Sequence, residues 1–276
     1  MPIWKALLLG LIQGLTEFLP VSSSGHLALM QLLMGLEEGA LSFSVALHVG
    51  SLAAVFIVFW KDIKSLLLGF AALFRPARRK EASGNPYVRL IVLLVITTLP
   101  LLVAVPFKGH IEGLMANPLY IGVALVVTAF VLKSTDHIKP GKKTERTARV
   151  SDVLTVGLMQ AAALTPGLSR SGLTISGGLW RGFDRDFAFR FSFLLSIPAI
   201  LGATALETFD IVKEGIDTTL LLPMLLGALV AFASGFVALI LLRKLLLSKK
   251  FSWFAWYCLA AGALTIILSV WPAAEG

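Results

Sequence analysis

Six apolar segments, each close to 20 residues long, constrain the fold of this chain more than any other feature. They cover about 40–60, 88–107, 117–133, 187–207, 218–242 and 252–271. A helix needs about 20 apolar residues to cross the hydrocarbon core of a bilayer. Only 14% of the residues are charged, whereas soluble domains carry about 25%. We therefore expect an all-α integral membrane protein with six transmembrane helices, and residues 1–276 forming a single membrane domain.

Two further apolar regions, 3–36 and 151–182, are each interrupted near the middle. Pro20 interrupts the first within "TEFLPVSSSGHL", and Pro166 interrupts the second within "TPGLSRSGLT". Proline lacks a backbone donor and disfavours helix in the residue before it. Each region therefore predicts a re-entrant helical hairpin. Such hairpins are tolerated at membrane depth only where protein or a wet cavity buries their backbone.

The basic residues lie mostly in connections between the apolar segments. They cluster within 61–89, 133–150, 181–190 and 243–250 and account for much of the net charge of +8. Cytoplasmic loops of membrane proteins carry such an excess of Lys and Arg. Six spans place all four clusters inside and both termini outside. This placement also argues against a nucleic-acid partner.

The two halves of the chain, about 1–138 and 150–276, resemble each other. "GLIQGLTEFLPVSSSGHL" from Gly10 aligns with "GLMQAAALTPGLSRSGLT" from Gly157, with one residue of slippage. The alignment pairs Gln13 with Gln160, Pro20 with Pro166, and Ser24-Gly25 with Ser171-Gly172. Each half is one hairpin followed by three spans, and an odd number of spans inverts the second copy. We therefore expect an inverted repeat; chance similarity between apolar segments is the alternative.

The first hairpin carries a carboxylate within a membrane-embedded segment. Gln13 and Glu17 are four residues apart, so on a helix they share one face. An ionised carboxylate inside a bilayer is costly and marks a functional site by default. The alternative is a glutamate whose side chain reaches the interface at the mouth of the hairpin.

A run of polar residues follows the first proline break. Ser22, Ser23 and Ser24 can cap a new helix, whose free amides and positive dipole end suit phosphate. Capping without any ligand is the alternative. His26 lies two residues further on, and together with Ser23 and Glu17 it would supply the imidazole, hydroxyl and carboxylate of an activated nucleophile.

The second hairpin places Arg170 between Ser169 and Ser171. Its planar guanidinium can bind two phosphate oxygens at once and stays charged. If the hairpins meet within the membrane, Arg170 and Ser171 face Glu17, and the two turns form a phosphate site. A purely structural ion pair between Arg170 and Glu17 is the alternative, because buried charges usually need partners.

The remaining histidines and the single cysteine carry no predicted chemistry. His48 lies inside the first span, where its flanks offer no acid–base partner, so we expect a hydrogen bond between helices. His110 and His137 lie in connections. Cys258 lies in an apolar segment and has no second cysteine with which to form an intrachain disulfide.

Three motifs carry a resemblance to a known family. They are "QGLTE" at 13–17, "LPVSSSGH" at 19–26 and the P-G-x-S-R-S-G pattern at 166–172. With them the chain resembles the bacterial undecaprenyl-diphosphate phosphatases of the bacitracin-resistance family over essentially its full length. Many members of that family have Glu where this chain has Gln13. The lipid phosphatases that use a P-S-G-H box are disfavoured, because no histidine follows Arg170 where they need one.

The resemblance implies hydrolysis of undecaprenyl diphosphate in a bacterial inner membrane, with the site facing the periplasm. It also implies a divalent cation, Mg²⁺ or Ca²⁺, with Glu17 as a ligand or acid–base group and Gln13 assisting. The implied catalytic residues are Glu17, Ser23, His26 and Arg170. The implied phosphate-binding residues are Gln13, Ser22, Ser24, Gly25, Ser169, Ser171 and Gly172. The nucleophile is left open among Ser23, His26 and a water molecule.

A transporter or flippase of an anionic lipid is the alternative function, since inverted repeats with broken helices are a transporter plan. The membrane lipid is the partner in either case. The sequence leaves the oligomeric state open, a homodimer included.

Overall fold

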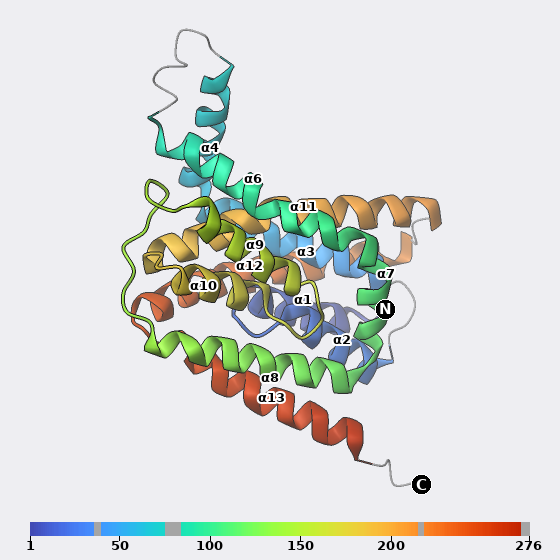
Figure 1. Ribbon diagram of the computed structural model, residues 1–276. Helices are drawn as coiled ribbons and strands as arrows, with labels where there is room; N and C mark the ends of the chain where they lie inside the picture. Colours follow the sequence, from blue (N-terminus) through green and yellow to red (C-terminus); the bar gives the residue numbers. More distant parts are fainter. Residues whose placement is uncertain (36–39, 75–83, 215–217, 272–276) are drawn as a thin grey trace.

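The computed structural model describes residues 1–35, 40–74, 84–214 and 218–271 (Figure 1). Across these residues the structure is helical, with one isolated bridge between Lys143 and Phe183. The helices are α1 (Ile3–Phe18), α2 (Ser23–Met34), α3 (Ala40–Val58), α4 (Trp60–Leu73), α6 (Pro86–Ala104), α7 (Lys108–Gly113), α8 (Pro118–Ser134), α9 (Val150–Ala162), α10 (Arg170–Trp180), α11 (Arg185–Glu214), α12 (Leu221–Leu247) and α13 (Trp253–Val270).

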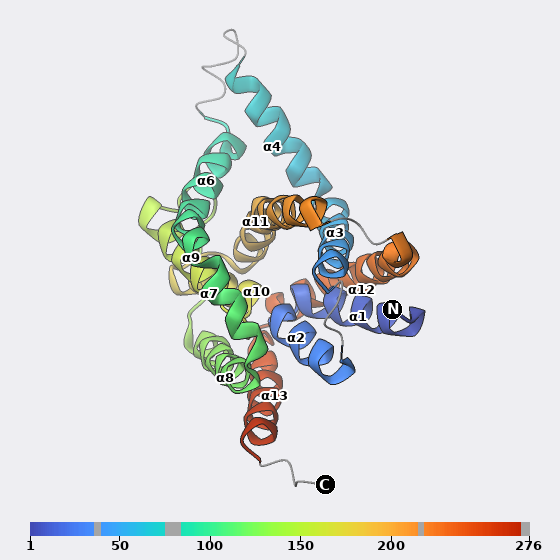
Figure 2. The same cartoon turned by 90° about the vertical axis from the view of Figure 1, so that its right-hand side faces the viewer.

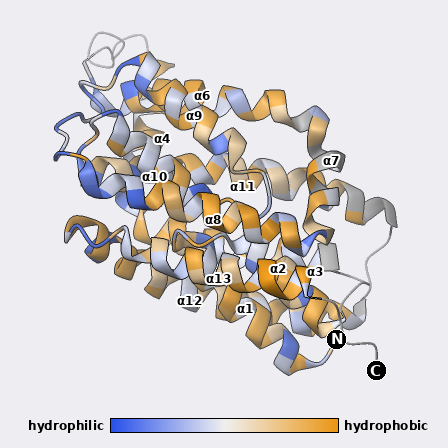
Figure 3. Cartoon of the chain, turned by 60° about the horizontal axis from the view of Figure 1, so that its bottom comes forward, coloured by the Kyte–Doolittle hydropathy of each residue, from blue (hydrophilic) through white to orange (hydrophobic). Residues whose placement is uncertain are grey.

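Five of the described helices, namely α6, α8, α11, α12 and α13, are long and apolar enough to cross a membrane. The pair α3 and α4 meets the same criterion as one span, although the two helices are bent by 81°. All six apolar segments thus form helices, but α4 was not expected, because we placed 61–89 in a connection. Part of that connection, 75–83, and the end of the first hairpin region at position 36 lie outside the described residues. Figure 3 shows apolar residues along the long helices.

The two broken regions form helix pairs that pack among the long helices. The first pair, α1 and α2, packs through α1 against α12, which in turn packs on α3. The second pair, α9 and α10, packs through α9 against α6, while α10 also contacts α8 and α11. Figure 2 shows α11 between α6 and α9 on one side and α3 and α12 on the other. α8 and α13 run side by side.

Small residues bring each short helix close to its long neighbour. A Cβ added at Gly10 of α1 would lie 2.4 Å from the carbonyl oxygen of Gly227 in α12. A Cβ added at Gly157 of α9 would lie 2.5 Å from the carbonyl oxygen of Thr97 in α6. Small residues allow helix backbones to approach closely where dispersion rather than water exclusion holds helices together. The first helix of each hairpin therefore packs closely on a long helix through a glycine.

An aromatic cluster fixes the end of α1. Phe18 is fully buried and packs edge-on against Phe193 of α11, with ring centroids 5.6 Å apart. Phe193 packs in turn on Phe189 and on Phe59, which directly follows α3. Aromatic pairs of this kind contribute about 0.5–1.5 kcal/mol beyond their burial. Because Phe18 directly follows Glu17, this cluster holds the Glu17 backbone between α3 and α11.

Candidate active site

The two chain breaks form serine-capped helix starts of the same type. Ser22 caps α2, and its Oγ accepts a hydrogen bond of 3.3 Å from the amide of Gly25. Ser169 caps α10, and its Oγ accepts one of 3.1 Å from the amide of Gly172. The capping predicted for the first hairpin is therefore present at Ser22, and Ser169 supplies a cap in the second hairpin that was not predicted. The Gly25 and Gly172 amides, which we expected to bind phosphate, donate to these caps.

The two breaks touch each other in the middle of the molecule. A Cβ added at Gly25 would lie 3.2 Å from the Cα of Gly167, and the Oγ of Ser171 donates to the carbonyl oxygen of Leu19 at 3.4 Å. Gly167 has φ +90°, and a Cβ there would come within 2.7 Å of the carbonyl oxygen of Ile121. Only glycine adopts this backbone without strain. The hairpins thus meet, which is the condition under which the sequence analysis placed Arg170 beside Glu17.

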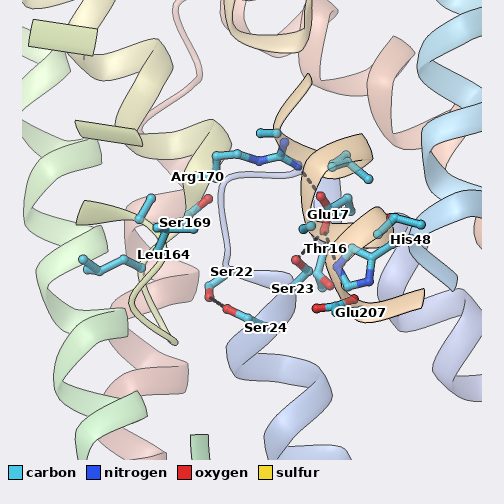
Figure 4. Close-up of a pocket in the computed structure, with 16 residues that line it drawn as sticks. Thr16, Glu17, Ser22, Ser23, Ser24, His48, Leu164, Ser169, Arg170 and Glu207 are labelled. Carbon is cyan, nitrogen blue, oxygen red and sulfur yellow. Dashed lines mark hydrogen bonds and ion pairs between the residues drawn. The ribbon is translucent and has the colours of Figure 1, made fainter. Parts of the chain in front are cut away.

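Glu17 is the point on which the two hairpins converge (Figure 4). Its side chain is 5% exposed and forms an ion pair through Oε1 with Nη2 of Arg170. Its Oε2 accepts hydrogen bonds from Ser23 Oγ at 2.6 Å and from Gln13 Nε2 at 3.0 Å. A buried carboxylate is costly unless it is paired and hydrogen-bonded. Here three donors from two hairpins meet that requirement.

A cavity of about 180 Å³ lies beside this cluster. The hairpins contribute polar groups to its wall, and α11 contributes mainly small and apolar ones. The polar groups from the hairpins are Thr16, Glu17, Ser22, Ser23, Ser24, Ser169 and Arg170. From α11 the wall takes Ala199, Ile200, Ala203, Thr204 and Glu207. Hydroxyls and one guanidinium around a hollow of this kind suit an anion that carries several oxygens.

His48 of α3 also lines the cavity, which corrects our expectation for this residue. Its Nε2 lies 3.9 Å from Glu17 Oε2, so it does have an acid–base neighbour. Its Nδ1 lies 2.9 Å from the carbonyl oxygen of Ser44, within its own helix rather than on another one. Because a carbonyl only accepts, Nδ1 carries the hydrogen, and in the neutral ring Nε2 is left as the acceptor beside the cavity.

His26 points away from the cavity that it was expected to line. Its Nδ1 lies 2.8 Å from the carbonyl oxygen of Ser22, and its Nε2 lies 2.7 Å from the hydroxyl oxygen of Tyr257 in α13. Ser23 follows Ser22 but turns toward Glu17 instead. The structure therefore brings Glu17, Ser23 and Arg170 together and leaves His26 behind the turn that carries Ser23.

The other predicted residues divide between cavity wall and hairpin contact. Ser24 and Ser169 line the cavity. Ser171 is buried, and its Oγ lies 3.3 Å from that of Ser169. Among the cavity residues that sequence reasoning missed, His48 and Glu207 are the two with titratable side chains. They were missed because each lies on a different helix from the motifs. A polar residue inside an apolar segment was the only signal that either one offered.

With the geometry in place, comparison with known proteins identifies the family. Residues 6–264 match the family described as Bacitracin resistance protein BacA. The chain belongs to this family. The resemblance stated from the three motifs is thereby confirmed.

Relatives within the BacA family match this chain along nearly its whole length. The undecaprenyl-diphosphatase of Alkaliphilus metalliredigens is 39% identical over 98% of this chain and 100% of its own. The undecaprenyl-diphosphatase of Methanosphaera stadtmanae is 38% identical over 97% of this chain and 98% of its own. The undecaprenyl-diphosphatase of Carboxydothermus hydrogenoformans is 37% identical over 96% of this chain and 97% of its own.

Proposed function

We propose that this chain hydrolyses undecaprenyl diphosphate to undecaprenyl phosphate and inorganic phosphate, and so recycles the lipid carrier of cell-wall synthesis. The observation that carries the proposal is the convergence of Ser23 and Arg170, from two different hairpins, on the buried carboxylate of Glu17 beside a cavity. The names of the relatives support the same substrate. A structural ion pair alone would not require the hydroxyls that surround it.

The contact between Ser23 and Glu17 supports Ser23 as the nucleophile. At 2.6 Å the Ser23 hydroxyl donates to the carboxylate, so Glu17 is placed to accept its proton. The Ser23 oxygen would form a bond to the terminal phosphorus, and the bond to the bridging oxygen would break, which releases undecaprenyl phosphate. Water would then hydrolyse the phosphoserine, release inorganic phosphate and restore the hydroxyl. Glu17 would activate that water in the same way.

Arg170 would change partners when substrate binds. In the described structure it pairs with Glu17 and also lies 3.5 Å, through Nη1, from the carbonyl oxygen of Ser196 in α11. A diphosphate in the cavity would compete with Glu17 for the guanidinium group of Arg170. As Arg170 turns to the phosphate oxygens, the Glu17 carboxylate loses a positive neighbour and becomes a stronger base. Substrate binding would thus activate the base.

His48 would assist from the opposite side of Glu17. Its Nε2 is an acceptor in the neutral ring and lies 3.9 Å from Oε2, a distance that one small shift of either side chain closes. An imidazole can take up the proton that Glu17 receives and return it to the departing phosphate. This role replaces the one that the sequence analysis gave to His26.

The described residues do not fit a resident divalent cation. They contain no group of three or more His, Cys, Asp or Glu side chains that could hold a metal. Both oxygens of Glu17 already accept from Arg170, Ser23 and Gln13, and Gln13 supplies an amide where many relatives of this type supply a second carboxylate. The proposal of Mg²⁺ or Ca²⁺ therefore rests on the resemblance alone, and no step above depends on it.

We also propose an inverted repeat of two hairpins and six spans, with both termini and the cavity facing the periplasm. The equivalent caps at Ser22 and Ser169 and the matched close approaches at Gly10 and Gly157 support the repeat. The one-sided basic connections support the orientation. In intact cells, a membrane-impermeant thiol reagent should label Ala116→Cys and leave Lys142→Cys unlabelled, with the parent chain as control. Labelling of Lys142→Cys alone would reverse the orientation.

The function is tested by phosphate release. Purified protein in detergent should release inorganic phosphate from a soluble prenyl diphosphate, and the Arg170→Ala variant should not. A lipid transporter without hydrolytic activity would release none. Running the assay with and without chelator also tests the cation.

A further inference from the structure

The His26 ring is held on both sides. Nδ1 faces the Ser22 carbonyl oxygen at 2.8 Å, and a carbonyl only accepts, so Nδ1 carries a hydrogen. In the neutral ring Nε2 is then an acceptor, and the Tyr257 hydroxyl at 2.7 Å donates to it. The two rings also lie nearly parallel, with an interplanar angle of 15°. To exchange a proton with substrate, His26 would have to break one of these two hydrogen bonds.

The turn that His26 holds has an unusual backbone. Ser22 has φ +70°, a value that residues with a side chain rarely adopt. Such a conformation persists only where contacts with neighbouring residues stabilise it. Besides His26, the surroundings include α13 directly, because the Sγ of Cys258 donates to the carbonyl oxygen of Pro20 at 3.4 Å. α13 therefore contacts this turn through two consecutive residues, Tyr257 and Cys258.

We propose that His26 is a positioning residue and that Tyr257 is its anchor. The chain of contacts runs from the Tyr257 hydroxyl to His26 Nε2, and from His26 Nδ1 to the Ser22 carbonyl. Ser22 in turn fixes the backbone of Ser23, whose hydroxyl lies 2.6 Å from Glu17. His26 acts on the reaction by holding Ser23 in line with Glu17, and it exchanges no proton with substrate. This inference rests on the proposed phosphatase function.

Replacing His26 by two different amides separates the two roles. In His26→Asn the amide nitrogen occupies the place of Nδ1 and can still donate to Ser22, but an amide does not titrate near neutral pH. In His26→Gln the amide extends to the place of Nε2, and the Ser22 carbonyl loses its side-chain donor and keeps only the backbone amide of His26, at 3.2 Å. His26→Ala removes both contacts. All three are compared with wild type for kcat, KM and the pH dependence of kcat.

His26→Asn also loses the contact with Tyr257, so we expect it to keep its turnover within about tenfold of wild type. Both limbs of its pH profile should be unchanged, since removal of an acid–base group costs about 10²–10⁴-fold. His26→Gln and His26→Ala should lose much more, mainly in kcat. If His26→Asn is as inactive as His26→Ala, or if one limb of its pH profile disappears, the positioning role is wrong. Thermal unfolding in detergent checks that each variant is folded.

Tyr257→Phe tests the anchor from outside the cavity. It removes one hydroxyl, and loss of one hydrogen bond corresponds to about a 2- to 10-fold decrease in turnover. Added to His26→Ala, it should cause no further loss, because the contact it serves is already gone. If the fold-losses in turnover of Tyr257→Phe and His26→Ala multiply in the double variant, Tyr257 does not act through His26. Phosphate release by the wild type tests the function itself, so a failure of the function and a failure of this inference give different results.

Discussion

Glu17 and Asp152 are both buried carboxylates, each paired with an arginine, yet their surroundings differ. Asp152 is fully buried and accepts from Lys143 Nζ at 2.8 Å and Arg181 Nε at 2.9 Å. It also accepts from the backbone amide of Arg149 at 2.9 Å. These bonds fasten the connection before α9 to the end of α10. Asp152 thus ties two segments together.

Glu17 differs because its donors Gln13, Ser23 and Arg170 are all side chains, and two of them, Ser23 and Arg170, line the cavity. Side chains can change partners when a ligand enters, whereas a backbone amide stays where the helix places it. The pair of carboxylates therefore shows that burial and an arginine partner do not distinguish a functional acid from a structural one. What distinguishes them is that Glu17 lines a cavity together with Ser23 and Arg170, whereas Asp152 is also held by a backbone amide.

The largest effect is expected at Glu17. Glu17→Gln keeps the size of the side chain but cannot accept a proton, and should lower phosphate release by about 10²-fold or more. The melting temperature should also fall, because Arg170 loses its ion-pair partner, so phosphate release is compared per folded molecule. The matched control is Asp152→Asn. Unchanged phosphate release in Glu17→Gln would show that the first hairpin is not catalytic and would remove the contrast between the two acids.

Substitution of the arginine beside Glu17 should lower turnover, and substitution of the arginine beside Asp152 should not. Arg170→Lys keeps the charge but loses the planar fork, and loss of a hydrogen bond to a charged group costs about 1.5–3 kcal/mol, or about 10- to 10²-fold in rate. Arg181→Lys, beside Asp152, is the control and should leave turnover unchanged. Steady-state phosphate release measures both. Near-wild-type turnover of Arg170→Lys would favour a structural ion pair at Glu17.

A smaller effect on turnover is expected at His48, the histidine that lies beside Glu17. His48→Asn keeps a donor for the Ser44 carbonyl but removes the Nε2 that faces Glu17, and should lower kcat by about tenfold, less than a full acid–base group. The same substitution at His26 is expected to leave both limbs of the pH profile unchanged, so the two variants control each other. Tolerance at His48 together with inactivation at His26 would return the acid–base role to His26.

The smallest effect on turnover is expected at Asp152. Burial raises the pKa of Asp152, but hydrogen bonds from Lys143, the Arg149 amide and Arg181 outweigh it and hold the pKa below its ordinary value. Its stabilisation is therefore present above the unfolded pKa of about 3.9 and is lost as pH falls through the lower folded value. Asp152→Asn should lower stability at neutral pH by about 1–2 kcal/mol, with turnover per folded molecule unchanged. Thermal unfolding across pH measures this; equal melting temperatures would contradict it.

Much of the fold could be predicted from the sequence, because apolar length and proline breaks are local properties. Pro20 and Pro166 marked both hairpin turns, and the serine cap of α2 followed from the residues beside Pro20. The meeting of Arg170 with Glu17 was expected once both hairpins were placed within the membrane. The 81° bend between α3 and α4 was not expected, since the sequence there changes gradually from apolar to basic.

The cavity wall was less predictable, because it depends on contacts between distant segments. His48 looked like an isolated polar residue, and only the packing of α1, α3 and α12 brings it to Glu17. His26 looked like a catalytic group because it lies three residues from Ser23. Residues three apart on a helix are usually neighbours on one face. Here, however, Ser23 at the start of α2 bonds to Glu17, and Tyr257 of α13 binds the imidazole of His26.

The close contact between Gly10 and Gly227 has a consequence for how the protein is made. α1 leaves the ribosome before the other described helices, and at 16 residues it is about 24 Å long, short of a full bilayer crossing. Its main neighbour, α12, is synthesised near the end of the chain. Until α12 is inserted, the face of α1 that contains Gly10 and Gly14 has only lipid or the insertion machinery against it. Glu17 therefore reaches its final surroundings only after α12 has been inserted, so a chain that stops before α12 carries no working active site.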